Sequence, residues 1–368
     1  MEKKKRLLFV GAFPPLGVKI YGGAVTACAT LKGAGLAEHF DLILLNSTQR
    51  TVPPPPVWLR FLYSLPRCWK YMWHVIRNRP DAILIFSSSG FSFLEKSLFA
   101  MFGHFFCRRV LLFPRGGRLM NDCRRGSLYR FFVKFMLRFP DILLCQGEAW
   151  RNFFTREIGE LPEKCVVLTN WSASPALIKI GATRTYHPMT NKKLQILFLG
   201  WVYRTKGIFE LLEAFSLLHS RFSNLELLIA GEGEASHSAR EYLCSKGLGA
   251  SVSFLGWIDG DQKLQTLADA DVFCLPSYVE GLPNAMIEAM ATGLPIVVTP
   301  VGSIPDFITH EVNGMISPIG DSQSLANCLE ALITSDSLRA RIGRNAYVTA
   351  SREFNAEKAV LHLSRLIT

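Results

Sequence analysis

Two glutamates lie eight positions apart in SYVEGLPNAMIEAMATG, residues 277–293, with Glu280 before the GLPN turn and Glu288 after it. The pattern predicts a strand at Val272–Leu275, a loop, and a helix beginning at Pro283, where proline is favoured. A helix N-terminus attracts phosphate. A carboxylate cannot bind phosphate, but it can accept hydrogen bonds from vicinal sugar hydroxyls. The pattern therefore predicts a diphosphate held at the helix N-terminus, with one glutamate at each of its ends to bind the hydroxyl groups there. The alternative is an ordinary surface helix with an acidic first turn.

A lysine follows another predicted strand in the same half of the chain. In LFLGWVYRTKGIFELLEAF, a strand ends at Gly200 and an amphipathic helix begins at Gly207. Lys206 therefore lies between a strand end and a helix N-terminus, where its point charge can hold a phosphate. Arg204 could do the same. The alternative is a solvated basic loop.

The first half of the chain contains two further candidates for anion binding. In GAFPPLGVKIYGGAVTACATL, Gly22 and Gly23 lie between a predicted strand and a helix, and glycines let the backbone approach an anion closely. The segment PRGGRLMNDCRRG begins with Pro114-Arg115 at the end of another predicted strand and is rich in arginine. The alternatives are an ordinary loop with a helix start and a solvated loop.

Two further segments at predicted strand ends, together with the distribution of the histidines, indicate which cofactors and metals to expect. The segment IAGEGE, which contains Gly231, has only half of a G-x-G-x-x-G fingerprint, which argues against a nicotinamide cofactor. The segment FLGWI, with Trp257 and Ile258, is suited to holding a base through main-chain groups. The histidines follow neither a nucleophile motif nor metal-ligand spacing, so the sequence predicts no metal site.

Short, nearly continuous apolar runs alternate with helical patterns, which is typical of parallel sheets covered on both faces. The predicted strands are Leu7–Gly11, Leu42–Asn46, Ala82–Phe86, Val110–Phe113, Ile142–Cys145, Val166–Thr169, Gln195–Leu199, Leu225–Ala230, Val252–Leu255, Val272–Leu275 and Ile296–Thr299.

This series restarts after a polar break near residues 182–191, and a chain of 368 residues is long for a single core. We therefore expect an α/β protein with two doubly wound, Rossmann-like domains, residues 1–185 and 186–350, followed by a C-terminal helix in 351–368 that could cross back to the first domain. In such folds ligands bind at the carboxyl ends of the strands. Two such ends facing each other would form a central cleft.

Charge is unevenly distributed. Residues 1–185 hold 27 Lys and Arg against 11 Asp and Glu, a net charge of +16, whereas residues 186–368 hold 14 against 19, a net charge of −5. The first half therefore favours an anionic partner: nucleic acid, anionic lipid or a phosphorylated substrate. The sequence has no RNA-binding or helix-turn-helix signature, so we do not expect nucleic acid. The nine cysteines form no C-x-x-C pair, which favours reduced, mostly buried thiols in a cytosolic protein.

Two segments interleave aromatic and basic residues. They are WLRFLYSLPRCWKYMWHVIRNR at Trp58–Arg79 and LYRFFVKFMLRF at Leu128–Phe139. Such amphipathic helices lie on anionic membrane surfaces, although core helices with snorkelling arginines give the same pattern. We expect membrane contact from the first segment and a core position for the second. The longest uncharged apolar stretch of the chain, Ser97–Cys107, is too short to span a bilayer.

The segment PSYVEGLPNAMIEAMATGLPIVVTPVGSIPDFI, with its E-x7-E element from Glu280 to Glu288, resembles family 4 glycosyltransferases, which have the GT-B fold. The segments FLGWVYRTKG, AGEGE and VNGMIS support the resemblance. The resemblance extends over nearly all of the C-terminal half. The N-terminal half resembles the family only loosely, through GAFPP, the following GG and the order of strands and helices.

The resemblance implies retaining transfer of a sugar from a nucleotide-sugar co-substrate, with no metal ion or bound cofactor. Glu280 would hold hydroxyls of the donor sugar, Glu288 would bind the ribose, and Lys206 would hold the diphosphate. In a front-side mechanism the leaving phosphate takes the proton of the acceptor, so no carboxylate nucleophile is needed. The remaining positions expected to bind the donor are Gly22, Gly23, Gly231, Trp257, Ile258, Gly281, Leu282 and Asn284.

The chain departs from the family pattern at two positions. Relatives commonly have arginine where this chain has Trp201, so either Arg204 substitutes or Lys206 works alone. Relatives often have histidine near the position of Arg115. Arginine cannot act as a base at neutral pH. It could instead bind the phosphate of a lipid-linked acceptor.

We therefore expect a glycosyltransferase at the cytoplasmic face of the inner membrane that uses a UDP- or GDP-sugar to extend a lipid-linked glycan, such as a bacterial surface-polysaccharide precursor. A nucleotide-sugar epimerase on the same architecture is the first alternative. A non-catalytic glycan-assembly protein is the second. The sequence gives no indication of oligomeric state.

Overall fold

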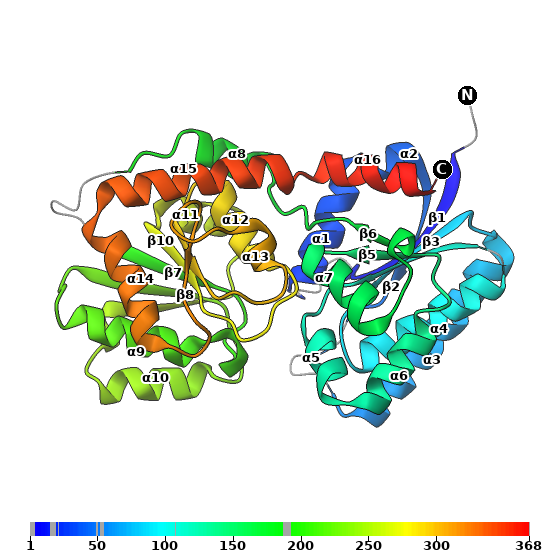
Figure 1. The fold of residues 1–368 in the computed structure, drawn as a ribbon, viewed down its shortest axis with the longest axis horizontal. Helices are drawn as coiled ribbons and strands as arrows, with labels where there is room; N and C mark the ends of the chain where they lie inside the picture. Colours follow the sequence, from blue (N-terminus) through cyan, green and yellow to red (C-terminus); the bar gives the residue numbers. More distant parts are fainter. Residues whose placement is uncertain are drawn as a thin grey trace. The chain divides into compact units, whose positions relative to one another are not determined.

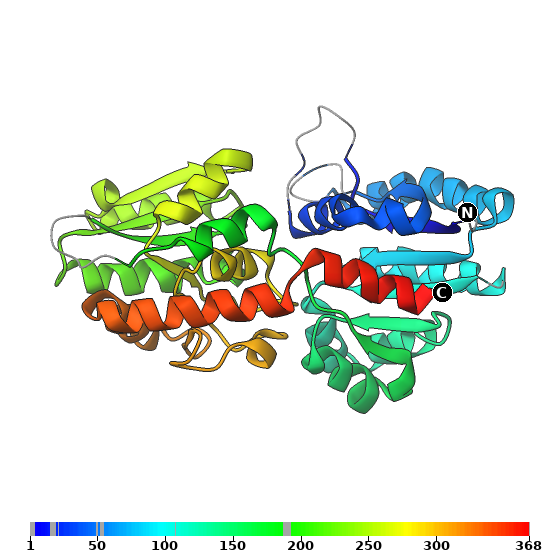
Figure 2. The same ribbon diagram turned by 90° about the horizontal axis from the view of Figure 1, so that it is seen from above.

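The computed structural model describes residues 4–14, 20, 22–48, 51, 55–106, 108–186 and 193–367. The chain forms two compact units, Met1–Trp171 with Ala356–Thr368, and Ser172–Asn355. Each unit has a six-stranded parallel sheet with helices on its faces (Figures 1 and 2).

The first unit has strand order β2-β1-β3-β4-β5-β6. Its strands are β1 Lys5–Gly11, β2 Phe40–Asn46, β3 Ala82–Ser87, β4 Arg109–Pro114, β5 Ile142–Cys145 and β6 Cys165–Val167. Its helices and helical turns are α1 Gly23–Leu31, η1 Lys32–Leu36, α2 Ala37–His39, α3 Val57–Trp73, η2 His74–Asn78, α4 Phe91–Phe105, α5 Arg118–Arg125, α6 Ser127–Met136, α7 Glu148–Asn152, η3 Phe153–Ile158, η4 Pro162–Lys164 and α16 Ala356–Ile367.

Alternate side chains of β1 point to opposite faces of this sheet. Leu8 and Val10 join a core cluster with residues of α4 and α5, whereas Leu7 and Phe9 join another with residues of α1 and α16. The helix α16 packs against α1 and η1, as Figure 1 shows. Burial on both faces explains why the strands of this sheet are continuous apolar runs.

The second unit has strand order β12-β11-β10-β7-β8-β9. Its strands are β7 Leu194–Leu199, β8 Leu225–Ala230, β9 Val252–Gly256, β10 Val272–Leu275, β11 Ile296–Val298 and β12 Met315–Ile316. Its helices and helical turns are α8 Pro175–Ala182, η5 Arg204–Lys206, α9 Ile208–His219, α10 Ser236–Ser245, η6 Gly249–Ser251, α11 Gly260–Asp269, α12 Asn284–Ala291, α13 Ile304–Phe307, α14 Ser322–Thr334 and α15 Asp336–Glu353.

The units divide at Trp171/Ser172, earlier than the expected boundary at 185/186. The expected boundary followed the polar composition after α8, but α8 itself packs against α12 and α15 of the second unit. A Cβ added at Gly181 of α8 would lie 2.3 Å from the carbonyl oxygen of Ala291. A close helix contact therefore attaches α8 to the second unit, whereas Ala356–Thr368 groups with the first.

Candidate active site

Lys206 and Glu280 meet at the carboxyl ends of β7 and β10, which are neighbours in the sheet. Lys206 Nζ lies 2.5 Å from Glu280 Oε1, and the Ser277 hydroxyl donates to the same oxygen at 2.8 Å. Both side chains of the pair are largely buried, at 21% and 9% exposure. A cation and a carboxylate are thus held together where the sequence predicted phosphate and sugar contacts.

A glycine brings the two loops into backbone contact. Gly207 has φ 71° at the N-terminus of α9, and a Cβ there would lie 2.0 Å from the carbonyl oxygen of Pro276. The Tyr278 N–H donates to the Thr205 carbonyl at 2.9 Å. Only glycine fits this approach without strain, so Gly207 is required for Lys206 to reach Glu280.

The helix α12 begins at Asn284, one residue later than predicted, and Pro283 is its extended N-terminal cap. The Asn284 side-chain oxygen accepts from the Ser172 hydroxyl at 2.8 Å. The preceding turn is held by Gly302 (φ 58°), since a Cβ there would lie 2.3 Å from the Gly281 carbonyl oxygen. Leu282 is buried. The predicted turn and the helix N-terminus are therefore fixed by close backbone packing.

Glu288 also has a lysine partner, which the sequence reasoning missed. Lys263 Nζ on α11 lies 2.9 Å from Glu288 Oε1, and the Glu288 side chain is 7% exposed. Each glutamate uses Oε1 for its lysine, and among the described residues neither Oε2 has a hydrogen-bond partner. Each site therefore combines an oriented carboxylate with one unused acceptor oxygen.

The predicted residues at the other strand ends lie close together. Gly231 has φ 146°, and its N–H donates to the Gly256 carbonyl at 2.7 Å. Ile258 is buried, and Trp257 is half-buried with its ring 5.1 Å from that of Trp201.

Arg204 is placed differently from Lys206. Its guanidinium lies over the Phe209 ring at 4.4 Å, on an exposed part of the turn. Of the two alternatives for this loop, Lys206 is the cation paired with Glu280.

Two of the predicted donor-binding positions, Gly22 and Gly23, lie in the first unit. Gly22 precedes α1 with φ 138°, and its carbonyl accepts from Val25 and Thr26 N–H groups. Gly23 is the first residue of α1. The loop that precedes Gly22 includes positions outside the described residues.

Arg115 is enclosed by aromatic rings. Its guanidinium lies 5.0 Å from the Phe86 and Phe113 ring centroids and 5.2 Å from that of Trp171. Burial lowers the pKa of Arg115 to about 10, so the group stays charged at neutral pH. Nη1 is buried and has no hydrogen-bond partner among the described residues. The two N–H groups of Nη1 are thus unused donors of the enclosed cation.

The helices α3 and α6 of the first unit both expose apolar side chains. On α3, Trp58, Trp69 and Trp73 are 65%, 68% and 55% exposed. On α6, where the sequence led us to expect core packing, Val133 and Met136 are buried, but Leu128 and Phe131 are 82% and 70% exposed, so that expectation holds for only one side of the helix.

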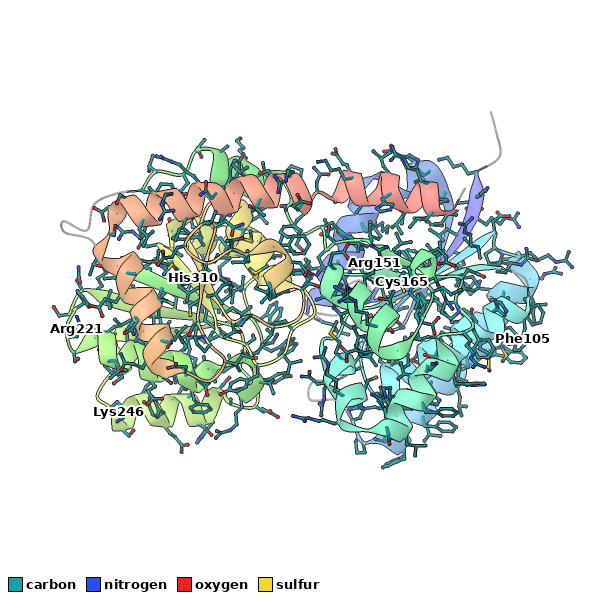
Figure 3. The ribbon with its side chains drawn as sticks, viewed as in Figure 1. Phe105, Arg151, Cys165, Arg221, Lys246 and His310 are labelled. Atoms are coloured by element: carbon teal, nitrogen blue, oxygen red, sulfur yellow. The ribbon has the colours of Figure 1, made fainter. Side chains whose placement is uncertain are left out.

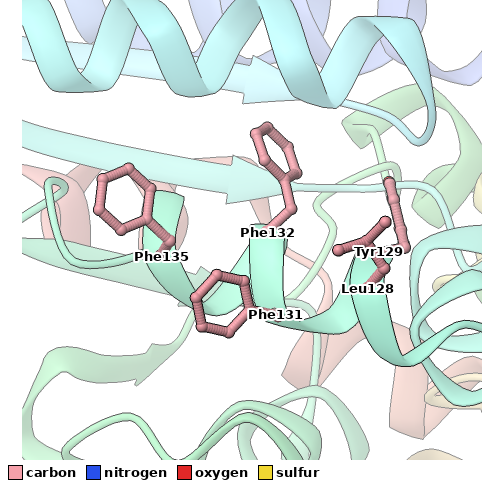
Figure 4. Close-up of a pocket in the computed structure, with 5 residues that line it drawn as sticks. All are labelled: Leu128, Tyr129, Phe131, Phe132 and Phe135. Carbon is pink, nitrogen blue, oxygen red and sulfur yellow. The ribbon is translucent and has the colours of Figure 1, made fainter.

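The helix α6 is apolar on both sides. It buries Val133 and Met136 against the unit, while exposed and half-buried side chains line an open groove of about 480 Å³, shown in Figure 4. The residues that line the groove are Leu128, Tyr129, Phe131, Phe132 and Phe135. Phe105 at the end of α4 is also exposed (Figure 3).

Neither a membrane-spanning helix nor a metal-binding cluster is present in the described part of the chain. No helix there is long and apolar enough to cross a membrane. No group of three or more His, Cys, Asp and Glu side chains there is arranged to hold a metal ion.

Comparison with known proteins matches residues 182–349 to the family described as glycosyl transferases group 1. The amylovoran biosynthesis glycosyltransferase AmsK of Erwinia amylovora is 30% identical over 48% of this chain and 45% of its own. The capsular polysaccharide biosynthesis glycosyltransferase CapM of Staphylococcus aureus is 29% identical over 47% and 45%. The matched region thus spans about half the length of these curated relatives.

Among solved structures, sucrose-phosphate synthase from Thermosynechococcus elongatus superposes with a TM-score of 0.77, at 16% identity over 99% of this chain and 98% of its own. Anabaena Alr3699/HepE, solved with UDP and glucose, has a TM-score of 0.72 at 17% identity over 98% of each chain. These similarities and the two sheets define the GT-B fold class, as predicted. Residues 182–349 match the model of the glycosyl transferases group 1 family, so the resemblance read from the sequence is confirmed over this part of the chain.

Proposed function

We propose that this chain is a retaining glycosyltransferase that moves a hexose-type sugar from a UDP- or GDP-sugar to a lipid-linked glycan acceptor in cell-surface polysaccharide biosynthesis. The observation that carries the proposal is the pair of lysine-held glutamates, Glu280 with Lys206 and Glu288 with Lys263, on either side of the turn before α12. The names of AmsK and CapM support polysaccharide biosynthesis. The complex of HepE with UDP-glucose supports a UDP-sugar as the first donor to test.

The geometry suits a front-side displacement. The bond from the anomeric carbon to the leaving phosphate oxygen breaks while a bond to the acceptor oxygen forms on the same face, and the departing phosphate takes the acceptor's proton. Lys206 Nζ and the N–H groups at the start of α12 stabilise the charge that grows on the diphosphate. The lysine supplies positive charge at the leaving group, so we propose that no metal ion is needed.

The glutamates bind hydroxyl groups in this scheme. Oε1 of Glu280 stays with Lys206 and Ser277, and Oε2 accepts from the donor sugar. Glu288 acts in the same way toward the ribose, with Lys263 fixing its orientation. A bound donor is thereby held at both ends, which positions its anomeric carbon for attack.

The test is transfer from UDP- and GDP-sugars to a lipid-linked glycan, with the product mass and anomeric configuration determined by mass spectrometry and NMR. We expect a product with the donor's configuration from the wild type and a loss of about 10²–10³-fold in kcat for Glu280→Gln. Lys246→Met, at an exposed lysine after α10 (Figure 3), is the control and should keep full activity. A donor isomer formed without acceptor would favour the epimerase, and no reaction with any donor would contradict the proposal.

We also propose that the chain binds the anionic cytoplasmic face of the inner membrane through α3 and α6. Residues 57–139 hold 15 Lys and Arg against 3 Asp and Glu. Lys70 and Arg77 are exposed near the α3 tryptophans, and Arg130 and Lys134 are exposed on α6. Exposed aromatic side chains beside cationic ones suit an interface of acyl chains and anionic headgroups.

Cosedimentation with phosphatidylglycerol-containing and pure phosphatidylcholine vesicles tests the membrane contact. We expect binding to the anionic vesicles, weakened by Trp69→Ala and by Phe131→Ala. Val348→Ala, which removes an exposed apolar side chain of the second unit, should change nothing. Equal binding to both vesicle types would contradict this part of the proposal.

A further inference from the structure

Two polar residues of the first unit follow the carboxyl ends of the neighbouring strands β4 and β5. The strands pair in parallel, with Leu112 opposite Leu143. The same register places Arg115, the residue after β4, opposite Gln146, the residue after β5. Because neighbouring strands lie about 4.8 Å apart, the backbones of the two residues are close together.

Both side chains belong to the face of the sheet that packs against α1 and α16. Every second side chain of a strand points to the same face. Phe113 and Leu144, two positions before Arg115 and Gln146, are both in the core cluster on that face. The guanidinium contacts agree, since they are 5.0 Å from the Phe113 ring and 5.2 Å from the Trp171 ring of the same cluster.

Each of the two side chains has one buried group that lacks a hydrogen-bond partner among the described residues. Gln146 is 1% exposed, and its Nε2 donates to Asn170 Oδ1 at 2.9 Å, whereas its Oε1 has no donor. Arg115 Nη1 is also buried and unpaired, although the residue as a whole is half-buried and so reaches solvent. Buried polar groups are almost always hydrogen-bonded, so a donor and an acceptor left unused here require a third group.

We infer that Arg115 and Gln146 together bind one neutral hydroxyl group of the acceptor glycan, an inference that rests on the glycosyl transfer proposed above. The hydroxyl oxygen accepts a hydrogen bond from Arg115 Nη1, and its O–H donates to Gln146 Oε1. Ligands of doubly wound folds bind at the carboxyl ends of the strands, which is where both residues lie.

The combination of a donor with an acceptor oxygen disfavours other ligand groups. An ionised diphosphate accepts from Arg115 but has no hydrogen to donate to Gln146, and an ammonium group is repelled by the guanidinium. The N–H and C=O of a trans acetamido group point in opposite directions, so one such group does not serve both side chains. A hydroxyl group is therefore favoured over the acceptor phosphate that the sequence suggested for Arg115.

The test measures which acceptor hydroxyl groups the enzyme requires. Dodecyl diphosphate glycosides of glucose, galactose and N-acetylglucosamine are the acceptors, and in the sugar that is used each hydroxyl is replaced in turn by hydrogen. At one position other than the linkage site, we expect the wild type to lose about 10- to 150-fold in kcat/KM, the range for a hydrogen bond to a charged group. Gln146→Met and Arg115→Met each remove one of the two bonds, so each should reduce this preference, and the double variant should abolish it.

Gln323→Met is the matched control. The exposed Gln323 of α14 also donates from Nε2 to an asparagine Oδ1, that of Asn327 at 3.1 Å, so its loss should leave the preference unchanged. Calorimetry with UDP and GDP should give wild-type affinities for every variant, because neither Arg115 nor Gln146 belongs to the proposed donor site. Wild-type nucleotide affinity also verifies that each variant is folded.

A preference that Gln146→Met and Arg115→Met leave unchanged would overturn the inference alone. Lower thermal stability of these variants with an unchanged preference would assign the two groups to a buried water. A requirement for the acceptor diphosphate that disappears in Arg115→Met but persists in Gln146→Met would also overturn it, because Arg115 would then bind phosphate. No transfer by the wild type to any of the three acceptors would contradict the proposed function, and this inference with it.

Discussion

At the scale of single residues, each glutamate of the candidate site is already paired with a lysine before any ligand binds. Lys206 and Glu280 form one largely buried ion pair, and Lys263 and Glu288 form another. In a buried ion pair both side chains are held in fixed orientations before a ligand binds. Removal of one partner leaves the charge of the other buried and unpaired. Each lysine therefore sets the geometry of its carboxylate as well as offering charge to a ligand.

Lys206→Met should lower kcat for sugar transfer by about 10²–10³-fold, because the departing diphosphate loses its point charge. Lys206→Arg keeps a charge but changes its geometry, so we expect it to recover only part of this loss. Steady-state kinetics with donors whose leaving groups differ in pKa provide the measurement. Donors with better leaving groups should suffer less from Lys206→Met, and equal losses for all donors would contradict the role in leaving-group stabilisation.

The assignment of Glu288 to the ribose makes a separate prediction. Wild-type protein should bind UDP more tightly than 2′,3′-dideoxy-UDP, by about 10-fold or more for a hydrogen bond to a charged group. Glu288→Ala should abolish this preference, and Lys263→Met should reduce it because the carboxylate loses its orientation. Competition binding gives both ratios, and a preference that survives in Glu288→Ala would place the ribose elsewhere.

Some site residues could be predicted from the sequence and others could not. Glu280, Lys206 and Glu288 were found because each follows a strand or lies beside a helix start, which is local information. Lys263 was missed because its pairing with Glu288 joins two helices and has no local signal. The contact of Trp201 with Trp257 was missed for the same reason, since it depends on how β7, β8 and β9 are ordered.

At the scale of elements, continuous apolar runs located most strands within one or two residues, because burial on both faces leaves little room for polar side chains. The strand β12 was missed, since Met315–Ile316 is too short for a recognisable pattern. The exposed side of α6 was not predicted, because a helix that is apolar on both sides does not indicate which side is covered.

A buried ionic cluster attaches α3 to α4. Arg67 Nη2 lies 2.7 Å from Glu95 Oε1, Lys96 pairs with the other carboxylate oxygen, and burial lowers the pKa of Lys96. Glu95→Gln should lower the free energy of unfolding of this unit by about 3–5 kcal/mol, because it leaves two cations without their carboxylate. Hydrogen exchange of α3 and α4 amides in urea provides the measurement.

The double variant Glu95→Gln, Lys96→Met is the control for this cluster. It removes one of the stranded cations, so it should restore a large part of the lost stability. If the double variant is less stable than Glu95→Gln alone, the loss arises from packing and not from unpaired charge.

At the scale of the whole molecule, the uneven distribution of charge predicts that vesicle binding and nucleotide binding depend differently on salt. Residues 1–185 carry a net charge of +16, whereas residues 186–368 carry −5. Binding of anionic vesicles should therefore weaken steeply between low salt and 0.5 M NaCl, because the Debye length falls from roughly 30 Å at 0.01 M to a few Å. Nucleotide binding at the largely buried site should change much less over the same range. Vesicle binding that is insensitive to salt would contradict an electrostatic contact.

The most direct test of the central claim is a thermal shift assay with UDP, GDP, ADP and CMP, with and without EDTA, on the wild type and on Glu288→Ala. A ligand at about a hundred times its dissociation constant adds about 2.7 kcal/mol to stability, which is an easily measured shift. We predict that a nucleoside diphosphate stabilises the wild type regardless of chelator and stabilises Glu288→Ala far less. No shift with any nucleotide, or equal shifts in both proteins, would contradict the assignment of a nucleotide-sugar site to this turn and helix.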